Sequence, residues 1–271
     1  MITSASNGRI KYVKDLLEKS RLRRKDACFV AEGVKMFLEA PSDRIKEVYV
    51  MESFIETSGK CSGSFGDRYG EIKQKLDKTN YEVVADSVFK KISDTVTPQG
   101  IITVVNTANA DINDVVKGDK PLIMVLENIQ DPGNMGTIIR TAEGAGVSGI
   151  LLTRDCVDIY NPKVIRSTMG SIYRSVFGYV ETTADALSVL ASKNIKTYAA
   201  ALNSEAKCYY DYEYTNGSAF IIGNEGNGLK EETINAADNV CYIPMSGCVE
   251  SLNASVAASI LMYEAKRQRR I

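Results

Sequence analysis

CYIPMSGCVESLNASVAASILMYE, residues 241–264, predicts a short buried strand at Cys241–Ile243, a loop at Pro244–Glu250 and then a helix. The body of that helix, Val256–Met262, carries almost no charge and is expected to be buried nearly all round. A polar helix start in apolar surroundings suits a small ligand or a reacting group. It equally suits an N-cap in front of a core helix. The small polar residues that open the helix are Ser251, Asn253 and Ser255.

The composition is that of a soluble α/β protein. A chain of 271 residues can hold two domains or one large one, and 44% hydrophobic with 25% charged residues is ordinary. No apolar run reaches the roughly 18–20 residues that span a bilayer, and the start, MITSASNGRIKYV, lacks the apolar core of a signal peptide. Six cysteines are scattered without metal-ligand spacing, as is typical of reduced thiols in the cytosol. We therefore expect a cytoplasmic protein with no membrane partner and no metal.

The chain contains no histidine. This excludes Ser-His-Asp triads, histidine-ligated metals and imidazole acid–base chemistry. Any catalysis must rest on other side chains or on a cofactor.

Positive charge is concentrated at the two ends of a chain whose net charge is only −1. Apolar residues at helical spacing, from Ile10 to Leu17, predict that the first basic segment is an amphipathic helix with its charges outward. Two basic ends can bind nucleic acid, and a solvated helix face with a frayed tail explains the same pattern. The basic residues are Arg9, Lys11, Lys14, Lys19, Arg21, Arg23, Arg24 and Lys25, then Lys266, Arg267, Arg269 and Arg270.

Strand-like and helix-like segments alternate through the first part of the chain and predict a small three-layer α/β domain. The polar stretch TANADINDVVKGDK, residues 107–120, marks a boundary. We therefore divide the chain into a domain at 1–110, a linker at 111–120 and a domain at 121–271. The expected strands are Cys28–Ala31, Glu47–Met51, Tyr81–Ala85 and Gly100–Val105; the expected helices are Val34–Glu39, a segment near Phe54, Ile72–Leu76 and Ser87–Ile92, with a Gly/Ser-rich loop at Ser58–Gly66.

In the second domain, buried strands joined by helices predict a mostly parallel sheet with both faces covered. Ligands of such sheets bind at the carboxyl ends of the strands, and three segments here leave a strand, turn and enter a helix. The expected strands are Leu122–Leu126, Gly149–Leu152, Thr197–Leu202, Ala219–Ile222 and Val240–Ile243; the expected helices are Pro162–Met169, Ala184–Ser192 and one that begins at Ile138 and ends near Gly144 and Gly146.

The first of the three segments is NIQDPGNMGTIIRT, residues 128–141, in which Asn134 and Arg140 could face one pocket. A turn with a surface arginine gives the same spacing. The second is IIGNEGNGL, residues 221–229, whose glycines allow backbone to pack against a ligand. It matches neither the dinucleotide fingerprint nor a P-loop. Glu225 within it would repel a phosphate, which favours an uncharged or cationic ligand.

The third segment is the opening stretch. There, Ile243 and Leu252 offer apolar walls, whereas Ser251 and Asn253 offer hydrogen bonds.

Together, the motifs DPGNMGTIIRTAEGAG, IIGNEGNGL and IPMSGCVESLNASVA resemble the SpoU (TrmH-like) branch of the SPOUT superfamily of RNA methyltransferases, over residues 122–270. The first part of the chain, from FVAEGVKMFLEA to TPQGIITVV, is similar to the L30e-like substrate-binding domain that often precedes it. The resemblance implies an S-adenosylmethionine-dependent ribose 2'-O-methyltransferase of ribosomal or transfer RNA. It also implies a homodimer and a C-terminal α/β domain with a parallel sheet and a trefoil knot.

The resemblance assigns roles to individual residues. RNA binding falls to the first domain and its basic helix, with Arg21, Arg23, Arg24 and Lys25 as the expected contacts. The catalytic positions are Asn134, Arg140, Glu225, Ser251 and Asn253, and the positions that line the cofactor are Gly223, Ile243 and Leu252.

The reaction moves a methyl group from a sulfonium to a ribose hydroxyl by in-line displacement, so the protein must align the reacting atoms and help to deprotonate the hydroxyl. A guanidinium is a poor base at neutral pH. We therefore expect Arg140 to hold an RNA phosphate and to stabilise the developing alkoxide. Glu225 and Asn134 are expected to orient Arg140 or the loops around it.

Ribosomal RNA, and 23S RNA in particular, is the expected substrate because the amino-terminal domain is large, by analogy with the family. The alternatives are a transfer RNA 2'-O-methyltransferase, an antibiotic-resistance methylase, and a non-catalytic RNA-binding or ribosome-assembly factor that keeps the fold. A dinucleotide-dependent oxidoreductase would need a fingerprint that the chain lacks.

Overall fold

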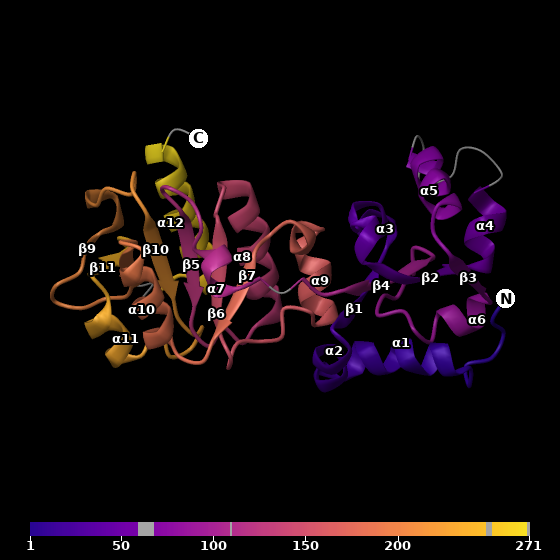
Figure 1. Ribbon diagram of the computed structural model, residues 1–271. Coiled ribbons are helices and arrows are strands. Elements are labelled where there is room, and N and C mark those ends of the chain that lie inside the picture. Colours follow the sequence, from indigo (N-terminus) through magenta and orange to yellow (C-terminus); the bar gives the residue numbers. More distant parts are fainter. Residues whose placement is uncertain (59–67, 109, 248–250, 270–271) are drawn as a thin grey trace. The chain divides into compact units, whose positions relative to one another are not determined.

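The computed structural model contains two compact units, each with its own β-sheet (Figure 1). Unit 1 is Met1–Ala108 with Tyr160–Tyr173, and unit 2 is Asn109–Ile159 with Arg174–Ile271. The structure describes residues 1–58, 68–108, 110–247 and 251–269. Most of the predicted loop at 58–66, the end of the loop at 244–250, and Arg270 lie outside the described residues.

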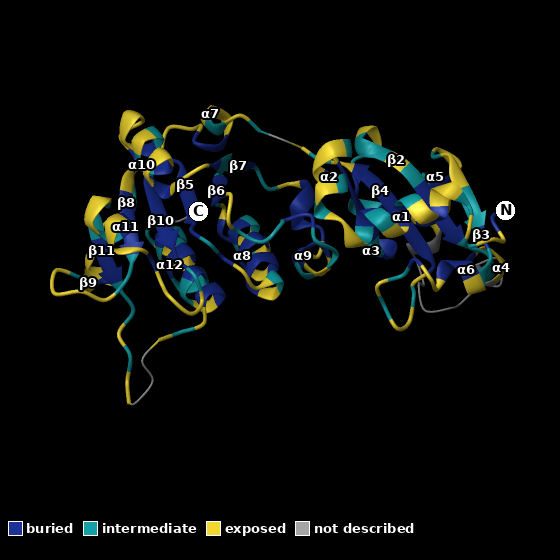
Figure 2. Cartoon of the chain, turned by 90° about the horizontal axis from the view of Figure 1, so that it is seen from below, coloured by how far each residue is buried: buried dark blue, intermediate teal, exposed yellow. Residues whose placement is uncertain are grey.

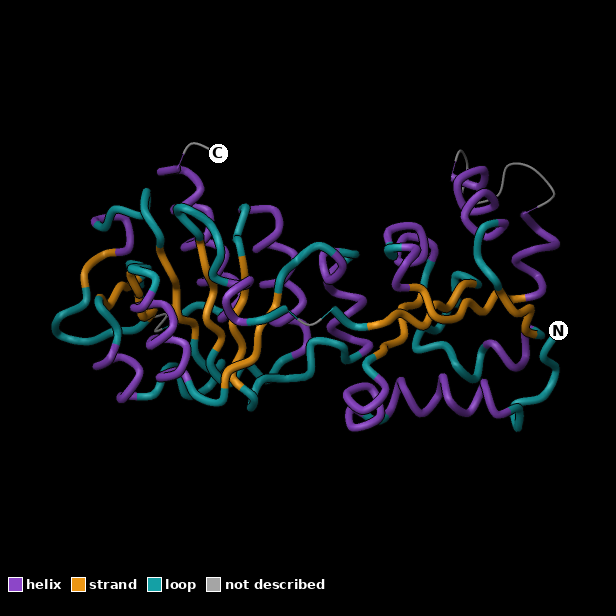
Figure 3. Tube along the Cα trace, viewed as in Figure 1, coloured by secondary structure: helices purple, strands orange, loops and turns teal. Residues whose placement is uncertain are grey.

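Unit 1 is built on a four-stranded mixed sheet in the order β1-β4-β2-β3. The central strand β4 runs antiparallel to β1 and β2, and β2 is parallel to β3. Helices lie on both faces (Figure 1, Figure 3), which confirms the predicted three layers. The strands are β1 (Cys28–Glu32), β2 (Ile45–Met51), β3 (Tyr81–Val84) and β4 (Ile101–Asn106), and the helices are α1 (Gly8–Glu18), α2 (Ser20–Asp26), α3 (Val34–Glu39), α4 (Glu52–Ser58), α5 (Arg68–Asp77) and α6 (Asp86–Phe89).

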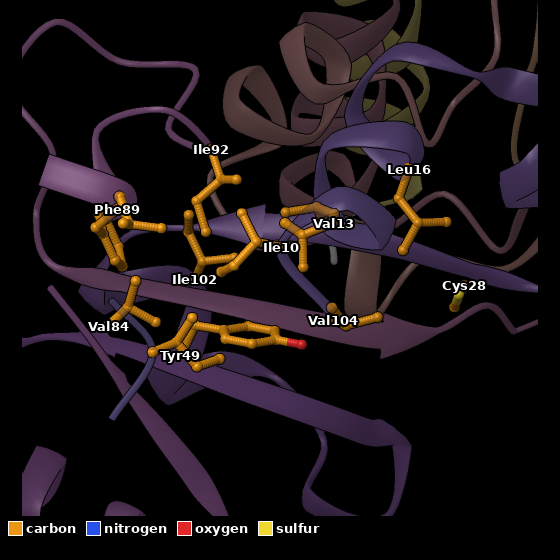
Figure 4. Close-up of a cluster of buried hydrophobic side chains, with 13 residues drawn as sticks. Ile10, Val13, Leu16, Cys28, Tyr49, Val84, Phe89, Ile92, Ile102 and Val104 are labelled. Carbon is orange, nitrogen blue, oxygen red and sulfur yellow. The ribbon is translucent and has the colours of Figure 1, made fainter. Parts of the chain in front are cut away.

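The two faces of this sheet carry separate apolar clusters, because side chains alternate across a strand. Tyr49 of β2 belongs to the cluster under α1 and α6, whereas its neighbours Val48 and Val50 belong to the cluster under α3 and α5. Figure 4 shows the first cluster, in which Ile10 and Val13 of α1 point toward the strands. The apolar residues of the basic segment are therefore buried against the sheet, as their helical spacing predicts.

The basic segment forms two helices, α1 and α2, rather than one, and one of its arginines points inward. Arg23 is 3% exposed, and its Nη1 donates to the carbonyl oxygens of Leu16 at 2.6 Å and Leu17 at 3.1 Å. These carbonyls belong to the last turn of α1, which has no intrahelical donors for them. The prediction that Arg23 contacts RNA is therefore wrong, because its guanidinium caps a helix. Arg21, Arg24 and Lys25 are exposed.

The segment Tyr160–Tyr173, which contains α9 (Pro162–Thr168), packs in unit 1 although its neighbours in sequence belong to unit 2. The Tyr160 ring stacks on Phe29 of β1 with the centroids 4.8 Å apart, and Arg166 pairs with Asp94 at 3.0 Å. The predicted second domain, 121–271, is therefore interrupted.

Unit 2 contains a seven-stranded sheet in the order β7-β6-β5-β10-β8-β11-β9, and every pair of neighbours is parallel, as predicted. β5, β6 and β10 are buried along their whole length, which explains their unbroken apolar sequences. The strands are β5 (Leu122–Leu126), β6 (Gly149–Thr153), β7 (Phe177–Val180), β8 (Lys196–Ala200), β9 (Lys207–Cys208), β10 (Ser218–Ile222) and β11 (Asn239–Tyr242).

Helices cover both faces of this sheet as well. α7 (Ile112–Val115), α10 (Thr183–Ser192) and α11 (Glu231–Ala236) lie on one face, and α8 (Pro132–Ala145) and α12 (Ala254–Arg269) lie on the other (Figure 2). Residues 111–120 are not a linker, because α7 packs against β6 and β7 and buries Val115 completely. β7, β9 and α11 are short elements that the sequence did not predict. The trefoil knot stays a prediction.

α8 begins at Pro132 rather than at Ile138, so the residues from Pro132 to Thr137 are helical and do not form a turn before the helix. Asp131 is the N-cap, since its Oδ1 accepts from the backbone N–H of Asn134 at 2.7 Å. Proline is favoured at the first helical position because its missing N–H would have no partner there. This early start puts Asn134 on the helix.

α12 is not buried all round. Val256 is 45% exposed and Tyr263 is 50% exposed, although the opposite side of the helix is buried. Its basic end is bonded within unit 2: Arg269 donates to the carbonyl oxygens of Lys120, Pro121, Tyr214 and Asn216, while Arg267 pairs with Glu264 at 2.8 Å. Arg269 therefore fixes the end of α12, so this arginine fits neither of the two interpretations of the basic end, a nucleic-acid contact or a frayed tail.

Among the described residues, four cysteines are free thiols: Cys28, Cys156, Cys208 and Cys241. The other two, Cys61 and Cys248, lie outside them. Within the same part of the chain, no helix combines the length and the hydropathy that a membrane span needs.

Candidate functional site

A cavity of about 370 Å³ lies at the carboxyl ends of β8, β10 and β11 in unit 2. Residues from four segments line it, at 200–202, 222–228, 241–245 and 251–261. This is the edge of a parallel sheet at which ligands are expected. Five of the predicted site residues line the cavity, namely Gly223, Glu225, Ile243, Ser251 and Leu252. Asn134, Arg140 and Asn253 do not.

The glycine-rich loop after β10 is closed on itself by backbone hydrogen bonds. The N–H of Asn224 donates to the carbonyl of Gly228 at 3.0 Å, and the N–H of Gly228 donates back at 2.9 Å. A Cβ on Gly223 would lie 2.4 Å from the carbonyl carbon of Gly228, so no larger residue fits there. Gly228 adopts a φ of +67°, which glycine tolerates best. Backbone, rather than side chains, therefore forms this wall of the cavity.

Glu225, at the tip of this loop, binds the start of α8. Its carboxylate accepts from the backbone N–H groups of Gln130 at 3.1 Å and Asp131 at 3.0 Å, and from Asn134 Nδ2 at 3.1 Å. Burial raises the pKa of this carboxyl, but these three hydrogen bonds outweigh burial and bring the pKa below its ordinary value. Glu225 is therefore an anion committed to the first loop and is not poised to act as a base.

Asn134, which is bonded to Glu225, is also bonded to the third loop. Its Oδ1 accepts from Asn253 Nδ2 at 2.9 Å. Asn253 is at the same time the N-cap of α12, because its Oδ1 accepts from the N–H of Ser255 at 2.9 Å and its carbonyl accepts from that of Ala257 at 2.9 Å. The N-cap interpretation of the polar helix start is therefore correct, and the interpretation as a ligand site stays a prediction. One chain of hydrogen bonds, Glu225–Asn134–Asn253, joins all three predicted motifs.

Comparison with known proteins gives the family. The sequence model of the SpoU rRNA Methylase family matches residues 121–263, and that of the MRM3-like substrate binding domain matches residues 7–103. The 23S rRNA (guanosine(2553)-2'-O)-methyltransferase RlmP of Bacillus subtilis is 30% identical over 278 residues, covering 98% of this chain and 98% of the relative. The chain belongs to the SpoU rRNA methylase family. The predicted family and the predicted methyltransferase activity are confirmed.

Two further matches agree with the SpoU assignment. The 23S rRNA (guanosine-2'-O-)-methyltransferase RlmB of Acinetobacter baylyi is 27% identical over 243 residues, covering 88% of this chain and 95% of the relative. The crystal structure of an AdoMet-bound rRNA methyltransferase from Sinorhizobium meliloti superposes with a TM-score of 0.83 at 25% identity, covering 98% of this chain and 97% of that one. This match confirms the predicted fold, a parallel-sheet SPOUT domain with a smaller α/β domain.

The cavity of this SpoU methylase suits a cofactor that combines an apolar ring system with a positive charge. Leu202, Ile243 and Leu261 supply apolar walls, and the glycine loop supplies backbone groups. Glu225 is the one charged side chain in the described lining. The volume lies within the ~300–1,000 Å³ that small-ligand sites occupy. Burial raises the pKa of the Cys241 thiol, which also lines the cavity, to about 12, so this thiol is neutral at pH 7.

Arg140 does not share a pocket with Asn134. The two residues are six positions apart on α8, about 120° apart around the helix axis, and Asn134 is buried whereas Arg140 is exposed. Arg140 makes no hydrogen bond or ion pair within the described part of the chain. Of the two expected roles of Asn134 and Glu225, their contacts within one chain fit orienting the loops rather than orienting Arg140.

Sequence reasoning missed two residues of the SpoU site. Asn224 Nδ2 donates to the carbonyl of Asn128 at 2.9 Å, and Glu127 accepts from the N–H of Lys230 at 2.9 Å. Both contacts tie the glycine loop to the loop after β5. Glu127 is an acid directly after a buried strand, a signal that could have been read; the Asn224 contact depends on β5 and β10 being neighbours, which sequence does not show.

The low pKa of Glu225 predicts how acid affects stability. A carboxyl whose pKa is lower in the folded state contributes stability that is complete above its ordinary pKa of 4.5 and is lost as the pH falls through the folded value. The difference in unfolding free energy between the wild type and Glu225→Gln should therefore stay constant from pH 7 to about pH 5 and shrink below pH 4.5. Urea unfolding across this range measures it. A difference that already shrinks between pH 7 and pH 5 would contradict the hydrogen-bonded carboxylate.

Proposed function

We propose that this chain methylates the ribose 2'-hydroxyl of a nucleotide in 23S ribosomal RNA, with S-adenosylmethionine as the cofactor. The observation that carries the proposal is the Glu225–Asn134–Asn253 chain, which joins three loops around a cavity of cofactor size. Support for the substrate comes from RlmP and RlmB, whose names give 23S rRNA 2'-O-methylation. Support for the cofactor comes from the AdoMet-bound relative.

The cofactor supplies an activated methyl group on a sulfonium, and the protein supplies alignment. Gly223, Ile243 and Leu252 would hold the cofactor against the glycine loop. Ser251, which is exposed at the mouth of the cavity, would bind the reacting end. Asn134, Glu225 and Asn253 would act by fixing the positions of the three loops rather than by moving protons.

Arg140 is the cation of the reaction in this proposal. A guanidinium stays protonated at neutral pH, so Arg140 would hold an RNA phosphate and stabilise the developing alkoxide. Arg140 is exposed and does not line the cavity of its own chain, so in this proposal it acts at the cavity of a second chain.

The surface on which Arg140 lies supports the proposed homodimer. The exposed residues of α8 at Thr137, Arg140 and Gly144 form one face, and Tyr263 of α12 lies over Gly144, with its hydroxyl 3.3 Å from the place of a Cβ there. Val256 and Tyr263 expose apolar surface on this side. We propose that two chains pack through α8 and α12 and that each contributes Arg140 to the other's site. Sedimentation of the full chain at micromolar concentration measures the mass, and a monomer would refute this.

Methyl mapping tests the proposed function. The expected result is one 2'-O-methyl position in 23S rRNA that disappears when the gene is removed, and that the purified chain restores with S-adenosylmethionine. A position in transfer RNA instead would favour the transfer RNA alternative. Failure to bind S-adenosylmethionine in calorimetry would favour a non-catalytic RNA-binding factor.

Arg140→Lys should lower turnover by roughly 10²-fold or more, because a lysine cannot make the bidentate contact and loss of a transition-state donor has a cost of this size. The affinity for S-adenosylmethionine should stay unchanged, since Arg140 does not line the cavity. The matched control is Arg154→Lys, an exposed arginine of unit 2 paired with Glu181 at 2.9 Å, which should leave turnover unchanged. Near-normal turnover of Arg140→Lys would exclude the bidentate role.

RNA binding is proposed for unit 1, and the structure separates two sets of its cations. Arg9, Lys14 and Lys19 are in ion pairs with acids of the same unit. Arg21, Arg24 and Lys25 have no ion pair within the described residues. Unpaired cations are better suited to phosphate, because no ion pair has to be broken. Placement in the cytoplasm, where ribosomal RNA is available, is part of the same proposal and is supported by the free cysteines.

Changing Arg21, Arg24 and Lys25 together to Ala should weaken RNA binding and reduce the slope of log K against log salt, by about 0.7–0.9 for each phosphate that the variant no longer neutralises. Changing the paired Lys14 and Lys19 to Ala is the control and should reduce the slope less. Arg23→Ala should instead lower the melting temperature, because two carbonyls of α1 lose their donor. Cofactor affinity should be the same in all variants; a parallel loss would contradict the division between the units.

A further inference from the structure

A buried carboxylate lies next to the cavity without lining it. Glu127 directly follows β5, is 2% exposed and makes no ion pair within the described residues. Its Oε1 accepts from the backbone N–H of Lys230 at 2.9 Å, and its Oε2 accepts from the hydroxyls of Thr183 and Thr233. A buried charge without a counter-ion is costly unless hydrogen bonds satisfy it, so these three donors account for its presence.

Two of these donors belong to the segment that leaves the glycine loop. Lys230 is the N-cap of α11, two positions after Gly228, and Thr233 lies in the first turn of α11. The third donor, Thr183, lies in the first turn of α10 and is not connected to the loop in sequence. The carboxylate therefore fixes the exit of the glycine loop to the end of β5.

The entry and the tip of the glycine loop are fixed to the same segment. Asn224 bonds the carbonyl of Asn128, and Glu225 bonds the N–H groups of Gln130 and Asp131. Asn128 thus holds Asn224, residues 130–131 hold Glu225, and Glu127 holds Lys230. Glu127 bonds the end of the glycine loop, next to Leu229, which is buried in the core.

We propose that Glu127 is a positioning residue that sets the shape of the glycine loop for the cofactor, without touching the cofactor. The proposal rests on the function proposed above. Without the carboxylate, the N–H of Lys230 and the buried hydroxyl of Thr233 lose their acceptor, and a buried donor without an acceptor drives the local backbone to rearrange. The glycine loop is the segment that can rearrange, because its glycines restrict the backbone least.

The test compares substitutions that remove different hydrogen bonds of the Glu127 carboxylate. For each full-length variant, calorimetry measures the Kd for S-adenosylmethionine. Glu127→Ala should raise the Kd by about tenfold or more. Glu127→Gln should restore the Kd to within about threefold, because its amide oxygen can accept from Lys230 N–H while its NH₂ donates to hydroxyls, which can also accept. Thr233→Val, on the loop side, should raise the Kd, whereas Thr183→Val, on the α10 side, should leave it unchanged.

The melting temperature separates positioning from general stability. Thr233→Val and Thr183→Val each remove one buried hydrogen bond to Glu127 and should lower it by similar amounts. Different Kd values at equal melting temperatures would support positioning. Equal Kd values in the two threonine variants, or a wild-type Kd in Glu127→Ala, would overturn it. If the wild-type chain itself did not bind S-adenosylmethionine, the function proposed above would fail instead, and the two failures are therefore distinguishable.

Discussion

The structure of the site depends on a chain of hydrogen bonds whose direction is fixed at both ends. A carboxylate only accepts, so Asn134 must turn its NH₂ toward Glu225 and its carbonyl oxygen toward Asn253. At the other end, the N–H of Ser255 only donates, so Asn253 must turn its oxygen toward the helix and its NH₂ toward Asn134. The two amides cannot flip independently. Three loops, from residues far apart in the sequence, therefore adopt one arrangement.

This arrangement is possible because of the sheet. Parallel strands place their carboxyl ends at one edge, and the position of β10 between β5 and β8 makes the first and second loops neighbours. The loop after β5 holds the glycine loop in place through several hydrogen bonds. The cavity is on the other side of the glycine loop, toward β8 and β11. Three acids beside these loops, Glu127, Asp131 and Glu225, accept hydrogen bonds from backbone N–H groups, so these carboxylates hold the loops in place.

Charged residues illustrate why a basic segment is ambiguous in sequence. Arg23 and Arg269 stand in runs of basic residues, yet both donate to backbone carbonyls: Arg23 to those at the end of α1, and Arg269 to those of the segments that precede β5 and β10. Spacing does not distinguish these arginines from Arg21 or Arg24, because their direction is decided by the element that packs against them. α9 shows the same at the level of domains: its sequence is that of an ordinary helix after a strand, and tertiary contacts, such as the stacking of Tyr160 on Phe29 and the Arg166–Asp94 ion pair, assign it to unit 1.

The sequence by itself determined the parallel sheet, its long buried strands, the three motif loops and the family, because unbroken apolar runs and the motif residues are local properties of the chain. It also predicted Gly223, Ile243 and Leu252 beside one cavity. Tertiary structure alone decided the strand order, the separation of Arg140 from Asn134, the contacts of Glu127 and the helical start at Pro132. The reason is that hydrogen bonds between loops join residues about 90 to 120 positions apart, and such pairings have no periodicity along the chain. The polar start of α12 needed both: its residues indicated a cap or a site, and the structure shows that Asn253 caps the helix and also donates to Asn134.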